Sequence, residues 1–494
     1  MVKRCVIIFL VLNTLFLNAQ IVDDSYVRQH YTKKSYNIPM RDGVKLYTLV
    51  YTPKDTSKTY PILLNRSCYN ASSHDNFQTN GQPSDYLVKD RYILVYQDVR
   101  GRYMSEGEFT TLTPNIPGND LNDTDAVDES SDTYDTIDWL INKLSNNNRK
   151  VGVFGISYPG FYTAAALPNA HPALKAASPQ APISDFFFDD FIHNGAYLLS
   201  YTAAFPVFGY QKSGLTKKPW YTEKLNRFWG NPPKDAYEFY LDLGPLKNIT
   251  KKYHYDNFFW NEMINHPNYD SFWQKRNILQ HLNNITPAVM TVGGWYDAED
   301  LYGPLSIYKT IEKNNPKAQN TIVMGPWAHG DWAREKGEHV HNHIYYGDSI
   351  STFYQKNIER KFFAHHLKGS DIKPMPEAYM YDTGIKQWQT FGVWPPKNTT
   401  KVKLYFDKKG VLVINRPAAA NQVFKYISDP ANPVPYRSET EGLTFTPRKY
   451  MTDDQRHASK RGDVLTFASK SLTKPLTIGC LLYTSPSPRD ATLS

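Results

Sequence analysis

Short runs of apolar residues alternate with helix-like segments in two parts of the chain, from about Ile38 to Gly195 and from about Ile285 to Lys368. The strand-like runs include residues 61–64, 150–154, 286–292 and 321–324. Buried strands that alternate with helices are typical of a parallel sheet covered by helices. We therefore predict an α/β fold built from residues 21–195 and 285–369.

The segment between these two parts, residues 196–284, interrupts the alternation and is rich in large aromatic residues. They include Trp220, Phe228, Trp229, Phe258, Phe259, Trp260, Phe272 and Trp273. Aromatic residues at helical spacing pack in a core more often than they contact a ligand. The pattern predicts a helical insertion.

After Gly369 the pattern changes to short alternating strands separated by proline and glycine turns, such as residues 378–381 and 402–406. This spacing is typical of an all-β sandwich, which we expect over residues 370–477.

One strand-like run, residues 150–154, leads directly into Gly155-Ile156-Ser157-Tyr158-Pro159-Gly160 and then into a helix-like segment. A nucleophilic serine needs this context, because the sharp strand-to-helix turn exposes its hydroxyl and the flanking glycines leave room for the turn. A bare match to this motif also occurs in structural turns, but the strand before it and the helix after it favour a nucleophile. We predict that Ser157 is that nucleophile.

Two further strand-like runs end in residues that complete a catalytic triad. The run over 286–292 is followed by Gly293-Gly294-Trp295-Tyr296-Asp297, and the run over 321–324 by Gly325-Pro326-Trp327-Ala328-His329-Gly330. Either residue alone could serve a turn or a loop. Ser, Asp and His in this order, each after its own strand, are typical of an α/β-hydrolase. We predict that Asp297 orients His329, which acts as the general base.

The same fold stabilises the oxyanion with the backbone N–H that follows the nucleophile, here that of Tyr158, and with a donor from an earlier loop. The loop after the run over 61–64 comprises Asn65-Arg66-Ser67-Cys68-Tyr69.

These motifs resemble a family that groups cocaine esterase, X-prolyl dipeptidyl peptidases, glutaryl acylases and α-amino acid ester hydrolases. The resemblance runs from about Tyr36 to about Pro475 and includes Arg41-Asp42-Gly43-Val44-Lys45-Leu46, Asp98-Val99-Arg100-Gly101-Arg102 with Ser105-Glu106-Gly107, Asp135-Thr136-Ile137-Asp138-Trp139-Leu140 and Arg360-Lys361-Phe362-Phe363. It implies that residues 196–284 are a helical cap, that residues 370–477 form a jelly roll, and that Tyr69 is the second oxyanion donor. Residues 478–494 match nothing in the family, so we expect a tail of doubtful origin and an incomplete sandwich with an unpaired edge.

The acidic run Asp297-Ala298-Glu299-Asp300 resembles the α-amino acid ester hydrolases within that family. The resemblance implies a carboxylate cluster for the substrate's α-ammonium group, made by Glu299, Asp300 and either Asp189 or Asp190, with Asp190 favoured. Carboxylates that share a partly desolvated pocket repel one another, and an arriving cation relieves that repulsion. Such acids otherwise cap helices or face solvent.

The composition is that of a folded protein, with 41% hydrophobic and 21% charged residues in a chain of 494. The net charge of +8 is spread over 56 basic and 48 acidic residues without a basic block, so we predict no nucleic-acid partner. The predicted chemistry needs neither a metal nor another cofactor, and no metal-ligand spacing involves the cysteines. A homo-oligomer is compatible with this composition.

Residues 1–20 combine Lys3-Arg4, an apolar run from Cys5 to Leu17, and Asn18-Ala19-Gln20. This pattern predicts a secretory signal peptide, and therefore a secreted or periplasmic protein that leaves the membrane once the signal is cleaved.

The sequence thus predicts a serine hydrolase that releases or transfers α-amino acyl groups from esters and from β-lactam antibiotic side chains. Its expected partner is a small ester or amide with a free α-amino group. Three alternatives stay open: an X-Pro dipeptidyl peptidase, a general carboxylesterase or acylase, and a catalytically silent binding protein on the same scaffold.

Overall fold

We analysed a computed structural model of the chain. The structure describes residues 22–72, 83–116, 123–193, 196–229, 234–334, 338–341, 344–370, 375–417, 423–440 and 451–479. The predicted signal peptide and nearly all of the tail after residue 478 lie outside these residues.

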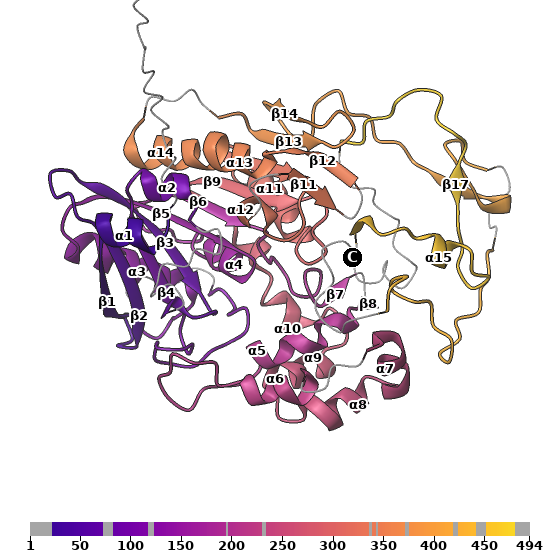
Figure 1. Cartoon of the computed structure of the whole chain (residues 1–494), viewed down its shortest axis with the longest axis horizontal. Coiled ribbons are helices and arrows are strands. Elements are labelled where there is room, and N and C mark those ends of the chain that lie inside the picture. The colour runs from indigo at the N-terminus through magenta and orange to yellow at the C-terminus, as the bar shows by residue number, and fades with distance from the viewer. Residues whose placement is uncertain are drawn as a thin grey trace, which may run out of the picture.

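A ten-stranded sheet forms the centre of the molecule, with the strand order β1-β2-β4-β3-β5-β6-β9-β10-β13-β14 (Figure 1). Pairing is antiparallel at the two ends of this order and parallel from β4 through to β13. The strands are β1 (Tyr31–Pro39), β2 (Lys45–Pro53), β3 (Tyr60–Ser67), β4 (Ile93–Asp98), β5 (Asn147–Ile156), β6 (Leu174–Gln180), β9 (Ala288–Gly294), β10 (Asn320–Gly325), β13 (Ala378–Asp382) and β14 (Gln387–Phe391).

Helices cover both faces of this sheet because its strands are apolar on both sides. In β3, Leu63 packs in the cluster that contains α14 (Arg360–Lys368), whereas Ile62 and Leu64 pack in the cluster that contains α3 (Glu129–Lys143). The remaining helices at the sheet are α1 (Asp24–His30), α2 (Asp85–Lys89), α4 (Tyr158–Ala165), α11 (Tyr302–Asn314), α12 (Asp331–Arg334), α13 (Ile350–Tyr354) and the π-helical η5 (Gln355–Glu359). The α/β-hydrolase-like prediction is confirmed.

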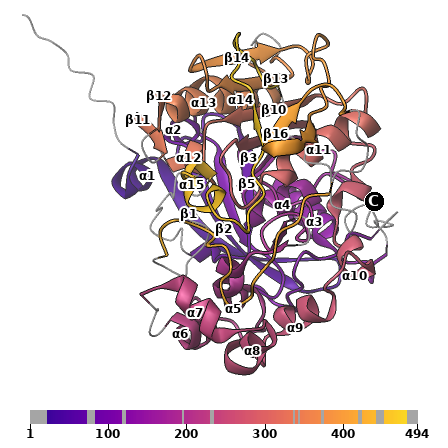
Figure 2. The same ribbon diagram turned by 90° about the vertical axis from the view of Figure 1, so that its right-hand side faces the viewer.

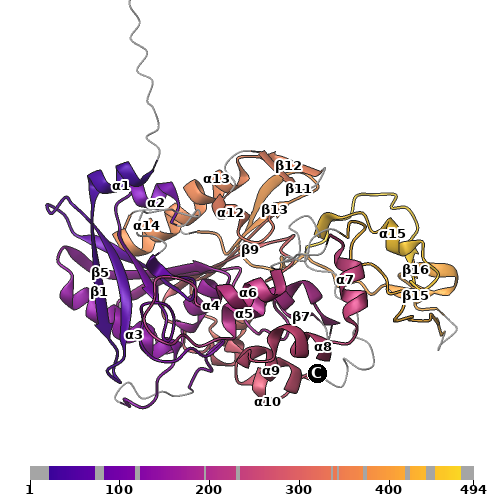
Figure 3. The same cartoon turned by 60° about the horizontal axis from the view of Figure 1, so that its bottom comes forward.

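The insertion between β6 and β9 is helical (Figure 3). It contains β7 (Ile192–His193), β8 (Ala196–Tyr197), η2 (Leu199–Ala204), α5 (Phe205–Phe208), α6 (Thr222–Trp229), α7 (Ala236–Leu243), α8 (Lys247–Ile249), η3 (Thr250–His254), α9 (Phe258–Asn265), α10 (Ser271–Gln274) and η4 (Ile278–His281). Trp260 and Trp273 are fully buried there and lie in one apolar cluster with Tyr158 and Phe161 of α4. The cap therefore packs on the part of the hydrolase domain that follows the predicted nucleophile.

Two local predictions are wrong. Residues 378–381, which we assigned to the sandwich, form β13, and this strand pairs in parallel with β10 in the central sheet (Figure 2). A short alternating strand fits either kind of sheet, so its pattern could not decide. Residues 65–67, which we assigned to a loop, extend β3 to Ser67, because their backbones continue the pairing with β4.

The C-terminal part forms a small separate sheet of β15 (Tyr405–Asp407), β16 (Val411–Val413) and β17 (Ala468–Ser469). In Figure 3 the labels of β15 and β16 lie beyond α7. Apolar side chains are exposed around this sheet, including Phe406 at 60% and Ile427 at 82%. The jelly-roll topology stays a prediction. The C-terminal part also contains η6 (Lys408–Gly410) and α15 (Arg456–Ser459).

Earlier in the chain, directly after α12, β11 (Glu338–His341) and β12 (Ile344–Asp348) pair as a separate antiparallel hairpin. Within the described residues, no helix is long and apolar enough to cross a membrane.

Candidate active site

Ser157 stands at the turn between β5 and α4 in a conformation that L-residues rarely adopt, with φ 67° and ψ −128°. The glycines beside it are required by close packing. A Cβ on Gly155 would lie 2.5 Å from the carbonyl oxygen of Pro159, and a Cβ on Gly160 would lie 2.5 Å from that of Gln180. The backbone N–H of Ser157 donates to Gln180 O at 3.0 Å. This is the strained turn that the sequence predicts for a nucleophile.

Asp297 and His329 lie after the ends of β9 and β10, which are neighbours in the sheet. The Nδ1 of His329 is 2.9 Å from Oδ2 of Asp297. Burial opposes the ionisation of Asp297, but the charge of His329 and hydrogen bonds to the carboxylate outweigh it and lower the pKa of Asp297. An ionised carboxylate in this place favours the imidazole tautomer that leaves Nε2 free to accept a proton.

The imidazole itself holds a proton more strongly than an ordinary histidine. Burial opposes its protonation, but the neighbouring carboxylates, Asp297 foremost, outweigh burial and raise the pKa of His329 to about 9. Among the described residues the Ser157 hydroxyl makes no hydrogen bond to His329. Such bonds are often long before substrate binds, so this geometry leaves the pairing of serine and histidine a prediction.

The predicted carboxylates gather beside His329. The Nε2 atom is 3.8 Å from Oε2 of Glu299, and Nδ1 is 3.8 Å from Oδ2 of Asp300. Asp190, with φ 62°, donates its backbone N–H to Glu299 O at 3.1 Å. The structure therefore brings Asp190, Glu299 and Asp300 together with the Asp297–His329 pair.

Asp300 is the least compensated member of this cluster. Both of its carboxylate oxygens are buried without a hydrogen-bond partner among the described residues. Burial, followed by the charge of Asp190, raises the pKa of Asp300 well above its ordinary value. Burial, followed by the charge of Glu299, likewise raises the pKa of Asp190. Two such groups side by side form a site that either keeps protons or takes up a cation.

The hydrogen bonds of Asp189 support the prediction that Asp190, and not Asp189, belongs to the carboxylate cluster. Asp189 Oδ2 accepts from the backbone and the hydroxyl of Ser184, and its Oδ1 accepts from Gly303 N–H at 2.8 Å. Both carboxylate oxygens of Asp189 are therefore engaged in holding the backbone of Ser184 and Gly303. The pKa of the Asp190 carboxyl is shifted by the charges of Glu299, His329 and Asp297, which supports Asp190 as a member of the cluster.

The two predicted oxyanion donors lie on neighbouring segments. Tyr158 opens α4, where the first backbone N–H groups of a helix have no intrahelical partner. Its ring is buried and meets that of Tyr69 edge-on at 6.5 Å. The Tyr69 residue is 41% exposed. Desolvation of its phenol, together with charges that include those of Asp190 and Glu299, raises the pKa of the phenol. The phenol therefore stays protonated and can donate.

The loop that carries His329 is held by residues that the sequence motifs did not predict. Asp331 Oδ2 accepts from Ala328 N–H at 2.8 Å, and Arg334 Nη1 donates to His329 O at 2.8 Å. Trp332 Nε1 donates to Gln180 Oε1 at 2.7 Å. Gln180 thus contacts the serine turn through its carbonyl and the histidine loop through its side chain. Contacts between segments about 150 residues apart leave no local pattern in the sequence. Only Asp331, two residues after His329, could have been noticed as a polar residue next to the motif.

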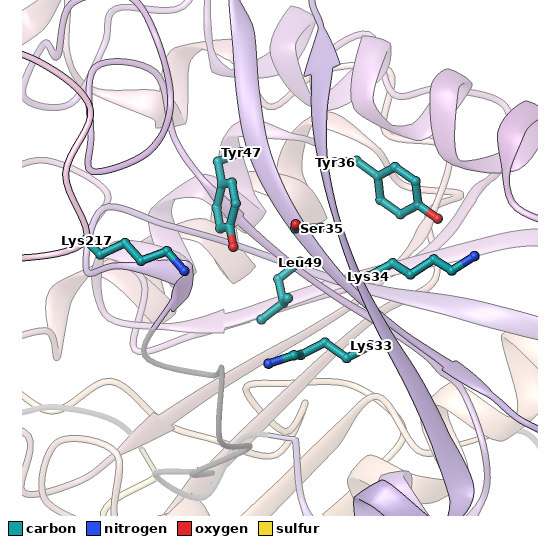
Figure 4. Close-up of a pocket in the computed structure, with 7 residues that line it drawn as sticks. All are labelled: Lys33, Lys34, Ser35, Tyr36, Tyr47, Leu49 and Lys217. Atoms are coloured by element: carbon teal, nitrogen blue, oxygen red, sulfur yellow. The ribbon is translucent and has the colours of Figure 1, made fainter.

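A separate surface depression of about 490 Å³ lies on β1 and β2 (Figure 4). It contains none of the predicted site residues. Its lining is Lys33, Lys34, Ser35, Tyr36, Tyr47, Leu49 and Lys217.

The chain is similar to a known protein family, to a relative by sequence, and to two solved structures. Residues 42–331 match the X-Pro dipeptidyl-peptidase (S15) family. The chain is 26% identical to a cocaine esterase from Rhodococcus sp. (strain MB1 Bresler) over 484 residues, which cover 92% of this chain and 77% of the relative.

Two solved structures are also similar. One is an aminopeptidase from the marine sediment archaeon Thaumarchaeota archaeon, with 32% identity and a TM-score of 0.77, covering 90% of this chain and 72% of the other. The other is an α-amino acid ester hydrolase, with 30% identity and a TM-score of 0.79, covering 94% and 77%.

Proposed function

Because the chain belongs to the X-Pro dipeptidyl-peptidase (S15) family of hydrolases, we propose that it is a serine hydrolase that cleaves α-amino acyl esters through an acyl-enzyme. The observation that carries the proposal is the buried carboxylate of Asp300, which accepts no hydrogen bond from any residue that the structure describes and lies beside His329. An uncharged acyl group gains nothing from such a carboxylate, whereas an ammonium group pairs with it. The specificity proposed is therefore for a free α-amino group next to the scissile carbonyl.

The proposed reaction follows from the order of the triad. Ser157 Oγ attacks the carbonyl carbon while His329 Nε2 takes its proton, and Asp297 stabilises the imidazolium. The Tyr158 N–H and the Tyr69 hydroxyl donate to the oxyanion. Collapse of the tetrahedral intermediate breaks the ester C–O bond, and His329 returns the proton to the leaving alcohol. Water, or an amine such as a β-lactam nucleus, then attacks the acyl-enzyme by the same route.

A second candidate is a peptidase that acts at a free N-terminus. It is favoured by the 32% identity to the aminopeptidase, since a peptide N-terminus presents the same ammonium to the same carboxylates.

The proposed enzyme is exported from the cytoplasm. This part of the proposal is supported by the signal-peptide pattern of residues 1–20.

The test compares four substrates on the purified protein: an α-amino acid ester, the same ester without its amine, the corresponding dipeptide amide and an X-Pro amide. We expect the amino ester to be hydrolysed best. Replacing Ser157 with Ala should lower kcat for it by roughly 10⁴ to 10⁶. Equal rates on the two esters would refute the amino-group specificity, faster cleavage of an amide would favour the peptidase, and full activity of Ser157→Ala would remove the serine from its role.

A further inference from the structure

Arg102 follows β4 and its side chain is fully buried, although it carries a permanent charge. Four aromatic rings surround its guanidinium carbon, and no carboxylate among the described residues forms an ion pair with it. The distances from that carbon to the ring centroids are 4.5 Å for Trp220, 4.7 Å for Phe109, 5.5 Å for Tyr103 and 5.7 Å for Tyr221. A desolvated cation over aromatic faces gains electrostatic energy from each of them.

The hydrogen bonds of this guanidinium are few and directed. Its Nε donates to the backbone carbonyl of Cys68 at 3.0 Å. Its Nη1 and Nη2 have no acceptor among the described residues. Among the residues that the structure describes, the buried cation therefore has its one hydrogen bond with Cys68, the residue that immediately precedes Tyr69.

Two of the surrounding rings belong to the cap. Trp220 donates its Nε1–H to Tyr210 O at 2.9 Å, and the hydroxyls of Tyr221 and Tyr103 are 2.9 Å apart. Arg102 thus lies between the cap and the loop that carries Tyr69.

The same loop is tied down at its far end. Asp98 accepts from Ala71 N–H at 2.6 Å, and Asn70 Nδ2 donates to Lys217 O at 3.0 Å. Residues 68–71 are consequently held from the sheet side and from the cap side.

Packing alone does not explain a cation here. A buried charge with one hydrogen bond loses hydration that an apolar side chain of similar size would not lose, so stability would favour the apolar residue. An apolar residue, however, could not hold the Cys68 carbonyl. That directed bond is what the arginine adds.

We propose that Arg102 is a positioning residue that fixes the Tyr69 hydroxyl for oxyanion stabilisation and links its position to the aromatic segment Trp220-Tyr221 of the cap. The proposal rests on the proposed function, since Tyr69 must be an oxyanion donor for its position to matter.

The experiment is a double-mutant cycle on the full chain with the amino ester as substrate. Arg102→Met removes the bond to Cys68 and the charge but keeps an unbranched apolar side chain. We expect kcat to fall by roughly 10-fold with KM changed less than 2-fold, because a displaced donor weakens transition-state binding. In a Tyr69→Phe background the same change should lower kcat by less than about 2-fold. Arg227→Met, which removes a cap arginine over the Tyr255 ring at 4.8 Å, is the matched control and should leave kcat unchanged.

Equal losses from Arg102→Met in both backgrounds, or a loss of thermal stability with unchanged kcat per folded molecule, would overturn the proposal. If Arg102→Met does not fold, Arg102→Lys serves in the cycle, since it keeps the charge and loses the planar fork; it should show the same dependence on Tyr69, and independence would overturn the proposal. If Tyr69→Phe alone leaves kcat intact, the proposed role of Tyr69 fails and that of Arg102 fails with it. If Tyr69→Phe lowers kcat but Arg102→Met does not, only the proposal for Arg102 fails.

Discussion

The buried carboxyls of Asp190 and Asp300 bind protons more tightly than carboxyls do in water. Asp190 and Asp300 both have a raised pKa, chiefly through burial, so each holds a proton more strongly than an ordinary aspartic acid does. An ammonium group that enters the site favours the ionised form of both carboxyls. Binding of an α-amino compound should therefore be coupled to proton release, and affinity for it should depend on pH through the protein as well as through the amine.

Neutralising the cluster should abolish the preference for the amine. In the double variant Glu299→Gln with Asp300→Asn, we expect the ratio of kcat/KM for the amino ester to that for the deaminated ester to fall by roughly 10²- to 10⁴-fold. This follows because each lost charge-assisted contact costs about 1.5–3 kcal/mol. Activity on the deaminated ester should persist. Asp185→Asn is the control: this buried carboxyl bonds to Tyr269 at 2.6 Å, outside the cluster, and an unchanged ratio there excludes a general effect of charge.

The pH–rate profile should report the same cluster through His329. The base must be neutral to accept a proton, and with a pKa of about 9 in the free enzyme it is mostly protonated at pH 7. The acid limb of kcat/KM should therefore lie well above pH 7. Bound ammonium offsets the carboxylate charges and lowers the pKa of His329, so the limb of kcat should lie at lower pH.

The double variant should shift the kcat/KM limb in that same direction, because it removes the charge of Glu299 from beside the imidazole. Initial rates across pH 5–10 on both enzymes give the comparison. Identical limbs for kcat and kcat/KM in the unmodified enzyme would contradict an ammonium at the cluster.

At this scale the sequence predicted residues that sit in motifs at strand ends and missed residues that act across the sheet. Asp297 and His329 meet as expected, at 2.9 Å, because parallel neighbouring strands bring their ends together. Gln180 carries no motif of its own. Its importance comes from lying beside the serine turn and the histidine loop, which only the strand order reveals.

Among the elements, the turn from β5 into α4 is the most sensitive to substitution. Gly160 faces the carbonyl of Gln180, and a methyl group there would push α4 away from β6. We expect Gly160→Ala to lower kcat by at least 10-fold and to reduce stability, since the displaced backbone moves both Ser157 and the Tyr158 N–H.

Gly214→Ala is the matched control for that substitution, because a Cβ at Gly214 meets nothing within 4 Å. Thermal unfolding and kcat for both variants decide the matter. Equal behaviour of the two would show that the close approach at Gly160 has no role.

Element type was predictable wherever buried apolar runs stood between turn signals, as for β5, β9 and β10. Membership of a sheet was not. The run that became β13 has the alternation of a sandwich strand, but the backbone N–H of Ile322 in β10 donates to Glu377 O at 2.9 Å and starts a parallel pair. Pairing with β10, which is distant along the chain, therefore determines the sheet to which β13 belongs, and the local resemblance to the following strands does not.

For the whole molecule, the central sheet extends past the predicted boundary at residue 369. A chain ended after Gly369 would lose β13 and β14 and leave β10 as an open edge beside the histidine loop. We expect that version to aggregate or to be inactive. A version ended after Asn398 keeps both strands and the bond from Tyr308 to Trp394 O, and it should retain more soluble, active protein. Size-exclusion chromatography and kcat per folded molecule measure this; similar results for the two versions would contradict it.

The position of β13 also bears on the order in which the enzyme is made. A chain emerging from the ribosome presents the nucleophile, the acid and the base by residue 329, but the strand that covers β10 follows some fifty residues later. Until residues 378–382 have emerged, a nascent chain that already has all three proposed catalytic residues carries an unpaired parallel edge. Parallel pairs of this kind form slowly, which leaves the edge open to aggregation. We therefore expect the growing chain to be most prone to aggregate in the interval between His329 and β13, the ninth strand of the sheet along the chain.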